Sequence, residues 1–340
     1  MDIEARYESV GRITTVEAPR RDPEAGEVRV RVQRCGVCGS DLHCFRGHSA
    51  LPPVCPGHEM SGIVEAVGTG AAGVREGDRV AVEPLLRCGE CRYCRRGDAQ
   101  LCPRLSLCGV SAPGGMASSI VVPDYTLFRL PSAVDFELGA LAEPMAVAVH
   151  AARLGGVTEG SRVLVLGAGT IGLVAVAAAK HLGASFVAIT ARHEQQRTLA
   201  ASLGADQVLD PNDLKPLAQR PDVVLETVGG EATTIADAVL AVARGGTVVM
   251  IGLFEKPPAF DPMVMLMKEV RLVGSMVYNR PPGRSADFDV ALEVLAARGD
   301  SLRALVTHTF PLARIQEAFE TAADKKSGAI KVMLSPTLAD

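Results

Sequence analysis

The strongest constraint on the fold is a strand, a glycine turn and a helix that follow one another between residues 162 and 180, RVLVLGAGTIGLVAVAAAK. An apolar run rich in valine is followed at once by closely spaced glycines and then by an alanine-rich stretch that favours a helix. The alternation continues through SFVAIT, a helix from about Glu194, DVVLETVG, GGTVVMIG and VRLVGSMV, to about Val277. Strands that alternate with helices predict a doubly wound α/β domain, a parallel sheet covered by helices.

The glycines of this turn fit the pattern G-x-G-x-x-G. In such a turn the first glycine permits the bend, the second lets the backbone approach a pyrophosphate, and the third lets the helix pack on the strand. A simple glycine turn is the alternative, but the position between strand and helix favours a dinucleotide site, where free N–H groups face the phosphates. The residues expected to bind the dinucleotide here are Gly167, Gly169, Thr170, Ile171 and Gly172.

The end of the second strand, AITARHEQQR, bears on which nicotinamide dinucleotide is bound. Ala191 occupies the position where an acidic residue would accept hydrogen bonds from a free ribose 2′-hydroxyl. Arg192 follows, with Arg197 close behind, and an arginine there pairs well with a 2′-phosphate. The alternative is that both arginines only solvate a surface helix. The pattern predicts NADP(H) in preference to NAD(H).

The first part of the chain has a different character. Between residues 26 and 130, short alternating runs such as EVRVRVQ and SGIVEAVG are separated by turn signals such as REGD and CPGH. A β-rich domain is therefore expected before the α/β domain. The tail, with DFDVALEVLAARG as a helix and AIKVML as a strand, could by its sequence alone belong to either domain.

Four of the nine cysteines lie in the segment CGECRYCRRGDAQLC, at positions 88, 91, 94 and 102. The spacing C-x2-C-x2-C-x7-C suits a tetrahedral zinc ion, and four thiolates would fill its shell, so Cys88, Cys91, Cys94 and Cys102 predict a structural zinc site. Disulfides and unrelated buried thiols are the alternatives. The opening MDIEARYESVGRI carries no secretion signal, so we expect a cytoplasmic protein with few disulfides.

Length and charge limit the classes of function. The chain has 340 residues, enough for two domains, and a formal net charge of −4, which does not favour nucleic acid or anionic lipid. The apolar stretch IGLVAVAAAK is far shorter than the ~20 residues of a membrane span. An alternative from another class is a zinc-stabilised nucleic-acid-binding module that uses Arg92, Arg95 and Arg96. It leaves the glycine turn without a purpose.

A second set of metal-ligand residue types lies in RCGVCGSDLH and PGHEMSG. Cys38 and His58 are of the kinds that bind zinc, and Glu59 adjoins His58. A redox pair of Cys35 and Cys38 is the alternative, but such pairs open a helix in a βαβ unit, whereas this stretch follows a β-rich run.

Together these residues resemble the zinc-dependent medium-chain dehydrogenases/reductases, in the branch of polyol, threonine and butanediol dehydrogenases. The resemblance rests on CGVCGSDLH, PGHE, GDRV, the four cysteines, AEPMAVAVH and GAGTIG, which occur in the family's order. It implies a GroES-like β-rich catalytic domain formed by residues 1–145 and 278–340, with a Rossmann cofactor domain at 146–277. It also implies a homodimer or homotetramer.

The resemblance further implies a zinc-dependent oxidoreductase that acts on a CH–OH group. Its zinc acts as a Lewis acid on the substrate oxygen while hydride passes to the nicotinamide. With the structural site, two zinc ions per subunit are expected. The residues matched to the catalytic zinc are Cys38, His58, Glu143 and the neighbouring Glu59. Ser40 and His43 match the relay that carries the proton to solvent.

The substrate is less constrained. Polyol dehydrogenases of this branch usually carry a tyrosine after the relay histidine and an arginine after the cofactor domain, where this chain has Cys44 and Val277. A secondary alcohol or its carbonyl is therefore the expected substrate. An NAD-dependent polyol or amino-alcohol dehydrogenase of the same fold is the alternative. Metal-free alkene reduction, as in other members, is disfavoured by Cys38, His58 and Glu143 together.

Overall fold

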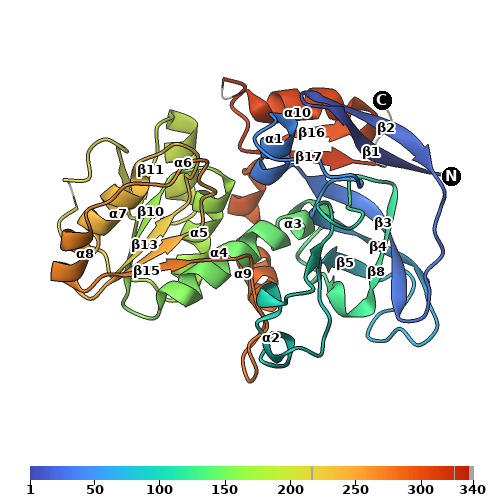
Figure 1. Cartoon of the computed structure of the whole chain (residues 1–340), viewed down its shortest axis with the longest axis horizontal. Helices are drawn as coiled ribbons and strands as arrows, with labels where there is room; N and C mark the ends of the chain where they lie inside the picture. Colours follow the sequence, from blue (N-terminus) through green and yellow to red (C-terminus); the bar gives the residue numbers. More distant parts are fainter. Residues whose placement is uncertain (216, 325, 337–340) are drawn as a thin grey trace. The chain divides into compact units, whose positions relative to one another are not determined.

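The computed structural model describes residues 1–336, apart from residues 216 and 325. The chain forms two compact units (Figure 1). Unit 1 contains Met1–Glu143, Asn279–Gly299 and the chain from Arg303 onward, and unit 2 contains Pro144–Tyr278 and Asp300–Leu302. Among the described residues, every helix is too short or too polar to cross a lipid bilayer.

Unit 2 is built on a six-stranded parallel sheet in the order β12-β11-β10-β13-β14-β15. All four residues from Val163 to Leu166 in β10 are buried, as expected for a strand covered on both faces. The order changes direction between β10 and β13, where α/β sheets bind their ligands. The strands are β10 Arg162–Leu166, β11 Phe186–Thr190, β12 Gln207–Leu209, β13 Val223–Glu226, β14 Thr247–Met250 and β15 Arg271–Gly274.

Helices α5, α6 and α7 pack on this sheet, and α8 packs on α7. The predicted parallel sheet with covering helices is confirmed, including the helix after the glycine turn. Three elements, β12, α7 and α8, are not predicted by the sequence pattern, because they are short and lack a strong periodicity. The helices within unit 2 are α5 Thr170–His181, α6 Glu194–Ser202, α7 Thr234–Ala241 and α8 Pro262–Lys268, and α4 Ala142–Gly155 begins at the end of the first segment of unit 1 and continues into unit 2.

Unit 1 contains a seven-stranded sheet with the order β16-β17-β3-β4-β5-β9, and β8 pairs with β3 beside this path. Two small sheets, β1 with β2 and β6 with β7, complete the expected β-rich domain. The strands are β1 Asp2–Ser9, β2 Arg12–Ala18, β3 Glu27–Gly36, β4 Glu59–Val67, β5 Arg79–Val82, β6 Leu85–Leu86, β7 Ser106–Leu107, β8 Ser119–Pro123, β9 Leu127–Arg129, β16 Val306–Pro311 and β17 Lys331–Ser335.

Helices are short in the first part of unit 1 and longer near the C-terminus. They are α1 Gly39–Phe45, α2 Arg92–Arg95, α3 Phe136–Ala140, α9 Asp287–Arg303 and α10 Ile315–Ala323. The predicted helix and strand near the C-terminus are confirmed as α9 and β17, whereas the β1–β2 hairpin, β16 and α10 were not predicted from the sequence. The last strand, β17, pairs with β3 in antiparallel fashion, so the C-terminal segment extends the sheet of unit 1.

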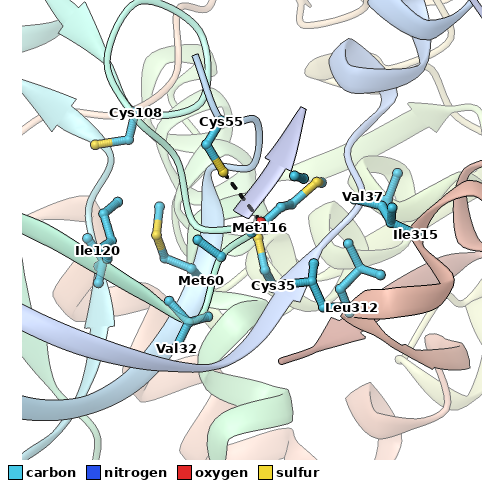
Figure 2. Close-up of a cluster of buried hydrophobic side chains, with 14 of the residues drawn as sticks. Val32, Cys35, Val37, Cys55, Met60, Cys108, Met116, Ile120, Leu312 and Ile315 are labelled. Carbon is cyan, nitrogen blue, oxygen red and sulfur yellow. Dashed lines mark hydrogen bonds between the residues drawn. The ribbon is translucent and has the colours of Figure 1, made fainter. Parts of the chain in front are cut away.

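The core of unit 1 joins residues from both ends of the chain (Figure 2). Val32 and Cys35 of β3 belong to the same buried cluster as Leu312 and Ile315 near α10. Cys55 donates a hydrogen bond through its Sγ to the carbonyl oxygen of Met116 at 3.4 Å. Because these side chains are buried together, the C-terminal segment contributes to the same hydrophobic stabilisation as the N-terminal strands.

Candidate metal sites and the glycine turn

The four-cysteine lobe brings its sulfur atoms into one group, all within 4.8 Å of one another. Cys91 to Cys94 and Cys102 to Cys88 each measure 3.5 Å between Sγ atoms, and Cys88 to Cys94 measures 3.8 Å. Four thiolates at about 2.3 Å from one zinc ion would be separated by about 3.8 Å, whereas a disulfide requires about 2.05 Å. Backbone N–H groups of Cys91 and Glu90 lower the pKa of Cys88 to about 6. The lobe therefore could hold a metal ion.

The lobe is anchored on the rest of unit 1 by Arg280. Its N–H donates to the carbonyl oxygen of Gly97 at 2.9 Å, and its guanidinium contacts the buried Glu83 at 2.6 Å. A Cβ on Gly97 would lie 1.9 Å from the carbonyl oxygen of Arg280, so only glycine fits this approach. The lobe thus holds the segment at which the chain re-enters unit 1.

Two of the lobe's arginines are engaged locally. Arg92 and Arg96 both lie against the ring of Tyr93, at 4.6 and 5.4 Å from its centroid, and Arg96 pairs with Asp98 at 2.6 Å. This arrangement gives little support to a phosphate-binding face on the lobe.

Cys38 and His58 come together because of the register between β3 and β4. Gly36 lies opposite Glu59 in that pair, so Cys38 just after β3 and His58 just before β4 lie at the same end of the sheet. The Sγ atom of Cys38, a ring nitrogen of His58 and a carboxylate oxygen of Glu59 all lie within 4.8 Å of one another. His58 and Glu59 are buried and Cys38 is half-buried, so this group too could hold a metal ion.

Helix α1 supports this group through Asp41 and Ser40. The N–H of Cys38 donates to Oδ2 of Asp41 at 2.9 Å, so Asp41 fixes the start of the helix. Ser40 Oγ lies 3.5 Å from Nε2 of His58, and Oδ1 of Asp41 lies 3.9 Å from Nδ1. Burial would lower the pKa of His58, but the negative charges of Cys38 and Asp41 raise it well above its ordinary value. His43, expected in the relay, is half-buried three residues after Ser40 on α1.

Glu59 is held by a buried lysine from the C-terminal strand. Lys331 Nζ donates to both carboxylate oxygens of Glu59, at 2.7 and 2.6 Å, and to the carbonyl oxygen of Val37 at 3.0 Å. Burial lowers the pKa of Lys331, but the charges of Glu59 and Cys38 outweigh it and the net shift is upward. A Cβ on Gly36 would lie 2.1 Å from Glu59 Oε2, so a larger residue at position 36 would displace this carboxylate from its present place.

Glu143 lies at the start of α4 and is buried, with 5% of its surface exposed. Burial raises its pKa to about 7, and the charge of His58 opposes the shift. It is not part of the group formed by Cys38, His58 and Glu59. Of the four matched residues, the structure therefore brings three together and leaves Glu143 as a buried neighbour.

The glycine turn after β10 has the geometry of a phosphate-binding turn. Gly167 has a φ of 100°, which favours glycine, and a Cβ on Gly172 would lie 1.9 Å from the carbonyl oxygen of Gly167. Around Gly169, in contrast, a Cβ would meet no atom within 4 Å. The N-cap of α5 is Gly169, which has no side chain to cap the helix, and Thr170 and Ile171 after it are half-buried, so the turn leaves room for an anion at the helix N-terminus.

The carboxyl end of β11 presents the residues expected to distinguish the cofactors. Ala191 is buried, Arg192 is exposed and Arg197 is half-buried on α6. Thr190 Oγ1, one residue before Ala191, accepts a hydrogen bond from the N–H of Gly167 at 2.8 Å. This bond ties the end of β11 to the glycine turn.

Among the supporting residues, Thr190 and Lys331 were not predicted from the sequence, whereas Asp41 was expected to be structural, as its place at the start of α1 bears out. Asp41 had a local signal, because it lies three residues after Cys38, the N-cap of α1. Lys331 had none, because its partner lies 272 residues away. The hydroxyl of Thr190 had no signal beyond its place at a strand end.

Two family descriptions match the chain. Residues 24–132 match the alcohol dehydrogenase GroES-like domain, and residues 170–297 match the zinc-binding dehydrogenase domain. The fold therefore places the chain in the class of proteins that combine a GroES-like domain with a Rossmann-type domain.

Individual relatives agree over almost the whole chain. A 2-dehydro-3-deoxy-L-galactonate 5-dehydrogenase of Pseudoalteromonas atlantica is 35% identical, with 93% of each chain covered. A sorbitol dehydrogenase of Macaca fascicularis is 35% identical over 93% of this chain and 90% of its own. A zinc-binding dehydrogenase structure from Sinorhizobium meliloti, bound to NADP, superimposes with a TM-score of 0.88 at 31% identity, covering 99% of both chains. The chain belongs to the zinc-dependent alcohol dehydrogenase family of medium-chain dehydrogenases/reductases, in its polyol dehydrogenase-like branch, and is an oxidoreductase.

The glycine turn yields a paired prediction. Gly172→Ala places a methyl group against the carbonyl oxygen of Gly167, and such overpacking typically costs 1–3 kcal/mol. Gly169→Ala meets open space, so it adds no overpacking and loses only the advantage of glycine over alanine at an N-cap, which is under about 1 kcal/mol. We expect thermal melting without ligand to show a larger loss of stability for Gly172→Ala than for Gly169→Ala. Equal melting of the two variants would contradict the packing role assigned to Gly172.

Proposed function

We propose that the protein transfers a hydride between NADP(H) and a secondary alcohol or its carbonyl compound, with a zinc ion at the group of Cys38 and His58. The observation that carries the proposal is the buried group of a thiol, an imidazole and a carboxylate, in a chain that also carries an open glycine turn. The membership of the chain in a family of zinc-dependent dehydrogenases supports it.

The donor atoms fit a catalytic zinc ion. One sulfur, one nitrogen and one carboxylate oxygen form a set that zinc accepts, and three protein ligands leave a position for a substrate. The Nδ1 atom of His58 is buried and has no hydrogen-bond partner in the described part of the chain, which also suits an ion nearby. Cys38 and His58 would hold the zinc with a carboxylate from Glu143 or Glu59. Zinc, when bound, supplies a Lewis acid that lowers the pKa of the substrate hydroxyl.

The side chains around this group would decide which carboxylate binds the zinc ion and would carry the proton of the substrate hydroxyl to solvent. Lys331 restrains Glu59 through two hydrogen bonds, which would leave Glu143 as the third ligand unless Glu59 is released. Ser40 would accept the substrate proton, because its hydroxyl lies beside His58. His43, one turn along α1, would pass it toward solvent.

The four-cysteine lobe would hold a second zinc ion, because its sulfur spacing fits a closed tetrahedral shell. With four thiolates it would have no open position for substrate. Its role would be to keep the lobe folded around Arg280 and Gly97.

The two units would have different functions, one in catalysis and the other in cofactor binding. We propose a catalytic domain of residues 1–145 completed by 278–340, and a cofactor domain of residues 146–277. The compact units change at Glu143 and Pro144 and again at Tyr278 and Asn279, close to these boundaries, which supports the division.

NADP(H) is proposed in preference to NAD(H) because the residues directly after β11, before Glu194, include no carboxylate. Ala191 stands where an acid would accept the 2′-hydroxyl, and the exposed Arg192 is available to a 2′-phosphate. The Sinorhizobium meliloti relative is bound to NADP and an Escherichia coli relative of 29% identity is bound to NADH, so the proposal rests on the residues after β11.

A polyol or sugar acid is the second candidate substrate, because the relatives include a sorbitol dehydrogenase and a 2-dehydro-3-deoxy-L-galactonate 5-dehydrogenase. Cys44 and Val277 argue for the less polar substrate, since neither side chain offers the hydroxyl-binding group expected at those positions. In this alternative the cofactor would be NAD(H).

We also propose that the protein assembles as a homodimer or as a tetramer built from such dimers. β15 forms the edge of the unit 2 sheet, and α8 before it exposes Met263, Leu266 and Met267 with 60–67% of each surface accessible. An apolar helix beside an open strand edge is the kind of surface that a second copy covers, pairing edge to edge across a twofold axis.

The metal proposal predicts about two zinc ions per chain by elemental analysis of metal-replete protein. Cys91→Ser should lose one zinc and much of the folded protein, because it opens the structural site. His58→Ala should lose the other zinc and turnover while keeping the fold. One zinc or none in the wild type, or equal loss of folded protein in both variants, would contradict the two roles.

The cofactor proposal predicts a higher kcat/KM with NADP(H) than with NAD(H) in a screen of secondary alcohols, polyols and amino alcohols. Because a charge-assisted hydrogen bond is worth ~1.5–3 kcal/mol, Arg192→Ala should lower the preference about tenfold to a hundredfold. Arg244→Ala is the control, since this exposed arginine precedes the amino end of β14. Equal kcat/KM with NAD(H) and NADP(H), or an unchanged ratio of these two values in Arg192→Ala, would contradict the proposed preference for NADP(H). Highest activity with polyols and NAD(H) would establish the alternative.

The assembly proposal predicts that Leu266→Glu combined with Met267→Glu converts the oligomer to monomers, because two charges would replace apolar contacts. Size-exclusion chromatography with light scattering gives the mass directly. Val10→Glu, an equally exposed apolar position in unit 1, should leave the oligomer intact. A monomeric wild type, or an oligomer that survives the double substitution, would rule out this surface.

A further inference from the structure

The carboxylate of Glu226, at the end of β13, is completely buried in unit 2. Its Oε1 atom accepts three hydrogen bonds: from the N–H groups of Val228 and Gly229 at 2.8 and 3.1 Å, and from the hydroxyl of Thr234 at 2.7 Å. Burying a carboxyl group is costly unless such bonds offset the loss of water. One oxygen atom therefore closes the loop of residues 227–234 on itself.

The same residue holds a second loop. The carbonyl oxygen of Glu226 accepts hydrogen bonds from the N–H groups of Ile251 and Gly252, at 2.9 and 3.1 Å, just beyond β14. Its Oε2 atom is buried without a hydrogen-bond partner among the residues that the structure describes. A Cβ on Gly252 would lie 2.6 Å from that oxygen, so this loop is shaped around the carboxylate.

Thr227, the next residue, connects this arrangement to the glycine turn. Its N–H donates to the carbonyl oxygen of Leu166 at 3.0 Å, and its hydroxyl donates to the same oxygen at 2.8 Å. A Cβ on Gly167 or on Gly172 would lie 3.0 Å from the Thr227 hydroxyl, so Thr227 packs directly behind the turn. Movement of the 227–234 loop would therefore disturb the phosphate-binding turn.

The loops that Glu226 holds lie at the edge of the sheet where α/β domains bind their ligands. β10 and β13 are neighbours at the point where the strand order changes direction, and dinucleotides bind across the crevice at that point. The adenosine ribose lies toward the strand that ends at Ala191, which is β11. The nicotinamide half must then lie toward β13 and β14, beside the two loops that Glu226 holds.

We propose that Glu226 is a positioning residue for the nicotinamide half of the cofactor. It acts by holding the loop of residues 227–234 against residues 251–252 and the glycine turn. The inference rests on the proposed function, since it requires a nicotinamide dinucleotide in this crevice. A purely architectural role would stabilise unit 2 without selectively affecting cofactor binding.

The test compares Glu226→Leu with Glu226→Gln. Leucine removes the acceptor of all three bonds, whereas glutamine keeps an oxygen at the position of Oε1. Hydrogen exchange of the apoprotein should be at least about tenfold faster at the amides of residues 228–232 in Glu226→Leu and unchanged in β10. Calorimetric titration with NADP+ and NAD+ should give a Kd raised at least about tenfold for Glu226→Leu and within about threefold of the wild type for Glu226→Gln.

Two further variants keep the inference falsifiable. Thr234→Val removes only one of the three donors and should show a smaller change in the same direction if Glu226→Leu does not fold. Thr247→Val is the control, because the buried hydroxyl of Thr247 at the amino end of β14 has no hydrogen-bond partner in the described chain. This variant should change neither the exchange rates of residues 228–232 nor the Kd for the dinucleotides.

Unchanged loop exchange, or a Kd within about twofold of the wild type in Glu226→Leu, would overturn the inference. So would faster exchange throughout the sheet in both Glu226 variants, because that is the result expected of a merely architectural residue. A wild type that binds neither dinucleotide would overturn the proposed function and the cofactor role of Glu226 with it. The exchange rates would still decide whether Glu226 holds the loop.

Discussion

The register of β3 against β4 is the constraint on which unit 1 depends. Pairing Gly36 with Glu59 places Cys38 and His58 at one end of the sheet, although residues 39–57, which include α1, separate them in the chain. It also turns the Glu59 carboxylate across Gly36 toward Lys331, on the strand that pairs with β3 from the other end of the chain. A slip of one residue would send these side chains to opposite faces and disperse the group.

Unit 2 reaches a comparable result by a different route. Parallel strands all end at one edge of their sheet, so the loops that follow β10, β11, β13 and β14 gather there without long-range pairing of side chains. Hydrogen bonds then join them: Thr190 to the glycine turn, Thr227 to the end of β10, and Glu226 to the loops after β13 and β14. The turn is thus held from both sides while Gly169 faces open space.

The features that the sequence predicted best are those whose residues lie close together in the chain. The four-cysteine lobe and the glycine turn are complete within a few residues, so spacing and local context were enough to infer them. Cys38 and His58 were recognised in the sequence as metal-ligand types, but they were matched to a catalytic zinc only through the family resemblance, since a single histidine carries no spacing signal. Lys331 and Glu226 could not be assigned roles, because their contacts depend on how distant strands pair and how loops pack. Both Glu59 and Glu143 were predicted as ligands; Glu59 lies in the group with Cys38 and His58, and Glu143 lies outside it as a buried carboxylate.

The central claim is that Cys38 and His58 hold a catalytic zinc ion distinct from that of the cysteine lobe. Anomalous diffraction at the zinc edge, from crystals of the metal-replete protein, tests it most directly. The account predicts two peaks in each chain, one among the four lobe sulfurs and one at about 2.0–2.3 Å from Cys38 Sγ and a ring nitrogen of His58. A peak in the lobe alone, with none beside Cys38 and His58, would contradict it.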